Sequence, residues 1–280
     1  MILLAVGAAV AWGASDFFGG ALRRGLPVFA VLAVTQLIGL LLLIPVLLLH
    51  GVPFPHNPRI LFAAAAGIGT TLELCLVYLA ISRGDSFITA PVAAIGATLA
   101  VLTGLIGGEQ LSLPVAAGLA CALCGGLSSA FSSPERPSSM PAAVGICLGA
   151  AVGLAGALVC LHAASRIDPV WAATLLDVGT LVPAVLIFSA RSGRARRTLP
   201  GLGRLWPLLL PAAAGVGGDL AYGTASRHGA LSIVSGVSCL YPLVTIGLGV
   251  LLQGRRAHLA EAGGLALAVA GTVLLGASTG

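Results

Sequence analysis

The stretch PVFAVLAVTQLIGLLLLIPVLLL, residues 27–49, decides the class of this fold because it contains no charged side chain over its whole length. A helix needs about 20 apolar residues to cross the hydrocarbon core of a bilayer. An apolar run of this length therefore predicts a transmembrane helix rather than a helix in the core of a soluble protein.

The rest of the chain has the same character. Its 280 residues are 58% hydrophobic and 8% charged, with a mean hydropathy of +1.07. A soluble domain carries about 25% charged residues, so the composition excludes a soluble enzyme, and it excludes disorder, which needs low hydropathy and high net charge.

The net charge of +5 comes from short loops and indicates no nucleic-acid partner. The expected partners are the lipid bilayer and a small-molecule substrate, and both a monomer and a homodimer remain open.

Ten apolar segments predict an all-α integral membrane protein with ten transmembrane helices. The segments are bounded by Arg, Pro and Gly, and cover residues 2–21, 27–49, 60–82, 86–107, 112–131, 141–164, 169–190, 205–226, 230–252 and 258–277. A linker rich in Ser and Pro, residues 132–140, separates a first five-helix repeat, residues 1–131, from a second, residues 141–280.

Similar motifs occur in the two halves. Ile81-Ser82-Arg83-Gly84 and Gly108-Glu109 in the first half correspond to Ala225-Ser226-Arg227-His228-Gly229 and Gly254-Arg255 in the second. Because five is an odd number, a second copy of five helices enters the membrane with the opposite orientation. Inverted repeats with a site near the midplane are a common plan of secondary transporters. Chance similarity between helices rich in Ala, Leu and Gly is the alternative explanation.

Arginine is distributed unevenly between the two faces of the predicted bundle. Arg59, Arg166 and Arg227 fall on the face with the N-terminus, and the other eleven of the 14 basic residues fall on the opposite face. The positive-inside rule then places the eleven in the cytoplasm and both termini outside it, in a multi-pass protein of the cell membrane.

Four acidic residues fall within the predicted spans: Asp16, Glu73, Asp177 and Asp219. A charged side chain at the centre of a bilayer costs about 2.5–3.5 kcal/mol on insertion scales, and usually marks a pathway, a proton relay or a counter-ion. These residues are therefore predicted to bind substrate or protons. The alternative is a protonated acid with a structural hydrogen bond to a neighbouring helix. The remaining acids, including Glu109 and Asp168, are expected at helix ends or in loops where water solvates them.

Aromatic residues are sparse, at 5%, so those near the acids are candidates for a binding pocket. Trp12 lies one turn before Asp16, and Tyr241 precedes Pro242; both are predicted to shape the pocket. Prolines within the spans predict kinks, at Pro45, Pro91, Pro183, Pro211 and Pro242.

No enzyme, cofactor or metal site is expected. Cys121 and Cys124 form a C-x-x-C without a second Cys or His pair, whereas a zinc site needs about four ligands. No histidine has an acid or a cysteine at the spacing of a catalytic dyad within a predicted span.

The stretch Trp12-Gly13-Ala14-Ser15-Asp16-Phe17-Phe18-Gly19-Gly20 resembles the first-helix signature of the EamA family in the drug/metabolite transporter superfamily. Ala90-Pro91-Val92 followed by Gly108-Glu109, and Leu240-Tyr241-Pro242 followed by Gly254, resemble further motifs of that family. The resemblance covers nearly the whole chain and implies a ten-helix carrier that alternates access through a central cavity. Members of the family are mostly exporters of amino acids, metabolites or toxic compounds.

Two residues depart from the pattern of the family. Gly96 replaces a proline that is frequent there and is matched by Pro242 in the second half. Arg255 replaces a frequent acid that is matched by Glu109 in the first half. Because of these departures, the substrates known for the family are not assigned to this chain.

Taken together, the residues and the resemblance predict a secondary transporter that exports a small organic metabolite, amino acid or drug, cationic or zwitterionic, with proton coupling as one option. Asp16 and Glu73 are predicted to bind a proton or a cation, with Asp177 and Asp219 as their counterparts in the second half. The alternatives are a facilitated uniporter of a neutral metabolite and a membrane scaffold that does not transport.

Overall fold

The computed structural model describes residues 1–22, 28–82, 89–130, 140–191 and 206–253, together with residues 263, 266–267 and 270–271. Every regular element within these residues is helical. Nine of the ten predicted spans fall in this part of the chain. Only five residues of the tenth span, 258–277, are described, and nearly all of the linker, 132–140, lies outside the described residues, so the count of ten helices stays a prediction.

The observed helices begin and end within a few residues of the predicted bounds. The first half contains α1 (Ile2–Leu22), α2 (Val28–His50), the short 3-10 helix η1 (Pro58–Leu61), α3 (Phe62–Ser82), α4 (Thr89–Ile106) and α5 (Leu113–Ala130). The second half contains α6 (Met140–Ser165), α7 (Pro169–Arg191), η3 (Trp206–Leu208), α9 (Leu209–His228), α10 (Leu231–Ser238) and α11 (Tyr241–Gln253).

The surface of the bundle is that of a membrane protein. In the described part of the chain, six helices are long and apolar enough to cross a bilayer by length and composition. The side chains of Leu3, Leu49 and Ile106 are 86%, 88% and 87% exposed, although each is strongly apolar. Water-soluble proteins rarely expose apolar area on this scale, whereas lipid covers it at no cost.

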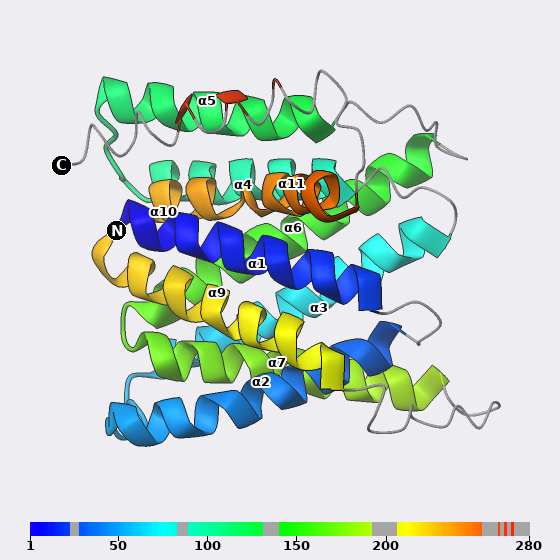
Figure 1. The fold of residues 1–280 in the computed structure, drawn as a ribbon. Helices are drawn as coiled ribbons and strands as arrows, with labels where there is room; N and C mark the ends of the chain where they lie inside the picture. Colours follow the sequence, from blue (N-terminus) through cyan, green and yellow to red (C-terminus); the bar gives the residue numbers. More distant parts are fainter. Residues whose placement is uncertain are drawn as a thin grey trace.

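The helices run side by side in one bundle, with α1 between α9 and the α10–α11 pair (Figure 1). α3 packs against α6 and α7, and α2 packs against α7 and α9. Small residues allow these close contacts: a Cβ atom on Gly67 or Gly179 would overlap the backbone of the facing helix. This is the packing expected where apolar lipid removes the hydrophobic driving force and van der Waals contact between helices replaces it.

The predicted span 230–252 is broken into two helices. α10 ends at Ser238, Cys239 and Leu240 form a turn, and α11 begins at Tyr241. Pro242 explains the break, because proline lacks an N–H and its ring clashes with the carbonyl four residues before it.

The interruption predicted at Pro242 is therefore present, whereas the kinks predicted at Pro91 and Pro211 are wrong. Pro91 and Pro211 lie in the first turns of α4 and α9, where the helix has no hydrogen bond for them to break. Pro45 and Pro183 do lie inside α2 and α7.

Candidate functional site

A cavity of about 480 Å³ lies between α1, α2, α3, α7, α9 and α11. Its lining extends from the middle of α3 and α7 to the last turns of α1, where Gly20 is exposed, and to the first turns of α2 and α9. The cavity is therefore reached from the face at which α1 ends. The opposite face, where α1 begins, is called the N-terminal face below. The volume lies within the range of about 300–1,000 Å³ typical of small-molecule sites.

All four acids predicted within the spans line this one cavity. They come from four different helices: Asp16 from α1, Glu73 from α3, Asp177 from α7 and Asp219 from α9. Asp16 and Glu73 interact electrostatically, and so do Asp177 and Asp219. The acids thus form one pair from each half of the chain. Among the described residues, no three of them lie close enough together to hold a metal ion.

Asp177 is 2% exposed and is held by a residue that the sequence did not single out. The Nε2 atom of Gln36, on α2, donates a hydrogen bond to Oδ1 of Asp177 at 3.0 Å. The second oxygen, Oδ2, has no hydrogen-bond partner among the described residues. An unpaired carboxylate oxygen in this setting is costly unless a proton or a cation occupies it.

Trp12 lies beside the cavity rather than in its lining. Its indole Nε1 donates a hydrogen bond to Oδ1 of Asp219 at 2.9 Å. The same ring packs at 5.4 Å between centroids against Tyr222 and meets Tyr241 edge-on at 6.4 Å. Tyr241 itself lines the cavity. Of the two aromatic residues predicted to shape the pocket, Tyr241 therefore lines the cavity. Trp12 lies outside the lining and contacts one of its acids, Asp219.

The electrostatic character of the cavity is negative. Its lining residues in the described part of the chain include the four acids and no arginine, and the whole chain contains no lysine. The polar side chains of Ser15, Thr35, Gln36 and Thr245 add hydrogen-bonding groups. Such a cavity favours a cation, or protons on its carboxyl groups, over an anion.

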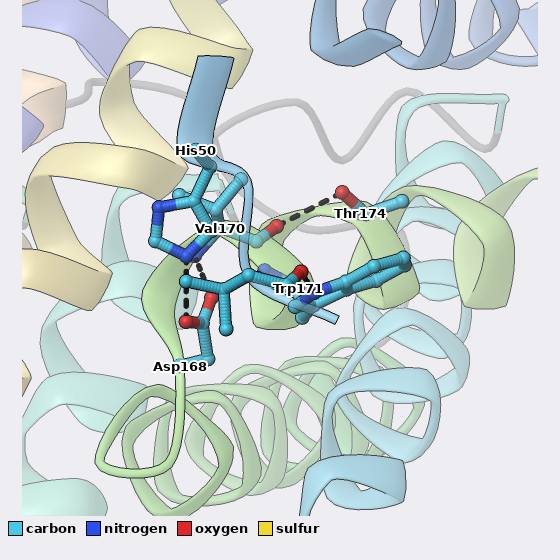
Figure 2. A network of polar contacts seen from close by, with 6 residues as sticks. His50, Asp168, Val170, Trp171 and Thr174 are labelled. Carbon is cyan, nitrogen blue, oxygen red and sulfur yellow. Dashed lines mark hydrogen bonds and ion pairs between the residues drawn. The ribbon is translucent and has the colours of Figure 1, made fainter. Parts of the chain in front are cut away.

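The expectation that water alone solvates Asp168 and Glu109 is wrong. Asp168 is 4% exposed, and its Oδ2 forms an ion pair with Nε2 of His50 at 2.7 Å (Figure 2). Its Oδ1 accepts hydrogen bonds from the backbone N–H groups of Val170 and Trp171, both at 2.9 Å, and so caps the start of α7. Asp168 is buried because the end of α2 packs over it.

Glu109 caps a helix of the other half of the chain. Its Oε1 accepts a hydrogen bond from the backbone N–H of Leu231 at 2.6 Å, and its Oε2 accepts one from Ser232 at 2.9 Å. These N–H groups are the unpaired donors at the start of α10. The Glu109 and Asp168 contacts both lie at the N-terminal face, opposite the mouth of the cavity.

The sequence indicates one part of these contacts, the helix cap formed by Asp168. Asp168-Pro169 before an apolar run is the pattern of an N-cap followed by proline at the first helical position. The partners His50, Gln36 and Leu231 had no such signal, because each lies more than 100 residues from the acid it contacts.

The fold and the cavity define a class: a helical membrane protein with an internal cavity lined by acidic residues. The profile of the EamA-like transporter family matches the chain twice, over residues 1–130 and 141–277. The chain therefore belongs to the EamA-like transporter family and contains two copies of its repeat, which confirms the resemblance found in the motifs.

Solved structures show the same fold. Twenty-eight chains are similar to this one. One of them, described only as a crystal structure of a protein, has a TM-score of 0.78 at 20% identity and covers 97% of this chain and 94% of its own. No curated protein matches the sequence significantly.

Proposed function

We propose that this protein is a secondary transporter that exports a small cationic or zwitterionic organic molecule by alternating access, in exchange for protons bound at Asp16, Glu73, Asp177 and Asp219. The observation that carries the proposal is the convergence of these four carboxyl groups, from four helices, on one cavity whose described lining has no basic residue.

Competition for the same carboxyl groups couples the two fluxes. Glu73 and Asp177 are buried, and each lies beside another acid, so the four carboxyl groups are too costly to be ionised together without a counter-ion. Either protons or a cationic substrate group neutralises them, and each excludes the other. A substrate that binds therefore releases protons, and protons that return displace the substrate.

The mouth of the cavity and the predicted topology support export as the proposed direction. The cavity is reached from the face at which α1 ends, and eleven of the 14 arginines are predicted on that face. By the positive-inside rule this face is cytoplasmic. The conformation described is then the one that takes up substrate from the cytoplasm. The predicted inverted repeat supplies the opposite conformation by exchanging the roles of the two halves.

Proton release by the purified protein tests the proposal. The protein in detergent and weak buffer is titrated with amino acids, polyamines and cationic drugs while the pH is recorded. We expect at least one compound to release protons, and we expect Asp16→Asn and Glu73→Gln to lose that release. Glu135→Gln, in the predicted linker, is the matched control and should behave as the unsubstituted protein. If no compound releases protons from protein that is shown to be folded, the result would contradict proton exchange and favour a uniporter of a neutral metabolite.

Transport in proteoliposomes tests Glu73 separately. Glu73→Gln is expected to abolish the pH dependence of transport while the protein remains inserted and folded. Transport by this variant with the pH dependence unchanged would remove Glu73 from the mechanism.

A further inference from the structure

A second group of polar side chains is buried between α6, α9 and α10, on the side of the cavity that faces the N-terminal face. We call it the polar seam, and it consists of His162, Ser165, Tyr222, Ser226, Ser232 and Ser235. The Tyr222 hydroxyl donates a hydrogen bond to the backbone oxygen of Leu158 at 3.0 Å and contacts Oγ of Ser235 at 2.8 Å. These contacts join all three helices.

Most polar groups of the polar seam lack a partner. The Oγ atoms of Ser165, Ser226 and Ser232 and Nδ1 of His162 are buried without a hydrogen bond among the described residues. The three serines are 0% exposed and His162 is 8% exposed. Buried polar groups are nearly always paired, and an apolar residue of similar size would stabilise this conformation more. The helices around the polar seam therefore leave these polar groups free to bind water or a substrate.

The internal repeat places the polar seam where a second vestibule belongs. The present cavity is lined by the last turns of α1, at Gly19 and Gly20, and by the second half of α3, at Val77. The first and third helices of the second half are α6 and α9. Their last turns carry Ser165 and Ser226, at the N-terminal face. An inverted repeat opens these two helix ends when it closes the first two.

The N-terminal face is held closed over the polar seam by specific contacts. Glu109 joins the end of α4 to the first N–H groups of α10, next to Ser232. A Cβ atom on Gly223 would lie 3.0 Å from Oγ of Ser165, so α9 packs closely on the end of α6. On the cavity side, the indole ring of Trp12 contacts both Tyr222 of the polar seam and the carboxyl group of Asp219.

We propose that the polar seam is the closed half of the translocation pathway, and that substrate leaves the cavity past Trp12 and Tyr222 between the ends of α6, α9 and α10. This inference rests on the alternating access of the proposed function and adds the residues of the second vestibule. It does not depend on protons as the coupling ion.

Thiol labelling from the two sides of the membrane tests the proposal. Ser226→Cys is reacted with a membrane-impermeant methanethiosulfonate cation in vesicles of either orientation, and the unsubstituted protein gives the background of the native cysteines. The matched control is Ala225→Cys, one residue earlier, 0% exposed and packed in the apolar core. We expect Ser226→Cys to react from the N-terminal face, about ten- to a thousandfold more slowly than an exposed thiol because minor conformations are populated to about 0.1–10%. We expect Ala225→Cys to stay protected.

Weakening the closure gives a second measurement. Glu109→Gln keeps one acceptor for the start of α10 and loses the other, so the labelling of Ser226→Cys should become about fivefold faster, as expected for the loss of one helix cap. The proposal is overturned if Ser226→Cys is labelled no faster than Ala225→Cys, both with and without Glu109→Gln. It is also overturned if Ser226→Cys is labelled only from the face opposite the N-terminal face.

The two proposals fail in different ways. If Ser226→Cys is labelled but ligands release no protons, the proposed vestibule is supported and proton exchange is contradicted. Ligand-induced proton release from a protein whose polar seam never reacts would retain proton exchange and contradict the vestibule.

Discussion

Trp12 and Asp219 lie 207 positions apart in the chain and are joined by a hydrogen bond of 2.9 Å from the indole Nε1 to the carboxyl Oδ1. The bond connects α1, in the first half, to α9, in the second, at the inner end of the cavity. Gly218 makes the contact possible, because a Cβ atom at that position would overlap the indole ring. Trp12 thus fixes the position of an acid that belongs to the other half of the protein.

Trp12→Phe should weaken ligand binding. Phenylalanine keeps an aromatic ring against Tyr222 and Tyr241 but has no N–H for Asp219. A hydrogen bond to a charged group contributes about 1.5–3 kcal/mol, so the apparent affinity should fall about tenfold or more. Ligand titration of the purified protein measures the change. The control is Trp171→Phe, which removes an indole bond of 3.0 Å to the backbone oxygen of Val52 at the N-terminal face. Equal affinities for the two variants would contradict a role for Trp12 at the site.

Gly39→Ala should disrupt the Asp177 carboxyl group. A Cβ atom on Gly39 would lie 2.6 Å from Oδ2 of Asp177 and 3.1 Å from Cγ2 of Val216. Overpacking of this kind costs about 1–3 kcal/mol, and relief by rotation of Asp177 would break its bond to Gln36. We expect ligand affinity to fall about tenfold. Gly217→Ala meets no atom within 4 Å and should bind normally. Normal binding by Gly39→Ala would show that Asp177 can shift without loss.

Asp168→Ala should destabilise the fold more than Asp168→Asn. Asparagine retains an acceptor for the N–H groups of Val170 and Trp171 and loses only the charge that pairs with His50. Alanine loses the helix cap as well, which costs about 0.5–2 kcal/mol more. Thermal unfolding in detergent, followed by circular dichroism, measures the order of the two variants. Identical midpoints would show that the cap contributes nothing to stability.

Gly13→Ala should separate α1 from α11. The added Cβ atom would lie 2.6 Å from the backbone oxygen of Tyr241 and 2.6 Å from Cβ of Val244. The same contact includes a hydrogen bond of 3.0 Å from Thr245 Oγ1 to the Gly13 oxygen. The backbone of α11 cannot yield cheaply, so we expect a loss of about 1–3 kcal/mol in the same thermal assay. Gly7→Ala, on the same helix with open space around it, should cost nothing. A Gly13→Ala variant as stable as Gly7→Ala would contradict this close approach.

The sequence alone determined the class of the protein and the identity of its acids. Hydropathy is a property that each residue contributes independently, so runs such as 27–49 predict spans without any knowledge of packing. The cost of a carboxyl group in the bilayer is equally local, which is why the positions of Asp16, Glu73, Asp177 and Asp219 within apolar runs were enough to select them. The local motif Trp12-Gly13-Ala14-Ser15-Asp16 indicated the EamA family, and the match of the family profile confirms it.

Only the tertiary structure decided which residues meet. These spans are apolar around most of their circumference, so their sequences lack the polar and apolar faces that show how a surface helix is rotated. The repulsion between Asp16 and Glu73, the contact of Gln36 with Asp177 and the burial of Asp168 beneath His50 all depend on that rotation. The rotation is set by van der Waals contact at small residues such as Gly67 and Gly179, whose partners lie on distant helices. Composition therefore fixed what lies in the membrane, and packing between helices fixed what faces the cavity.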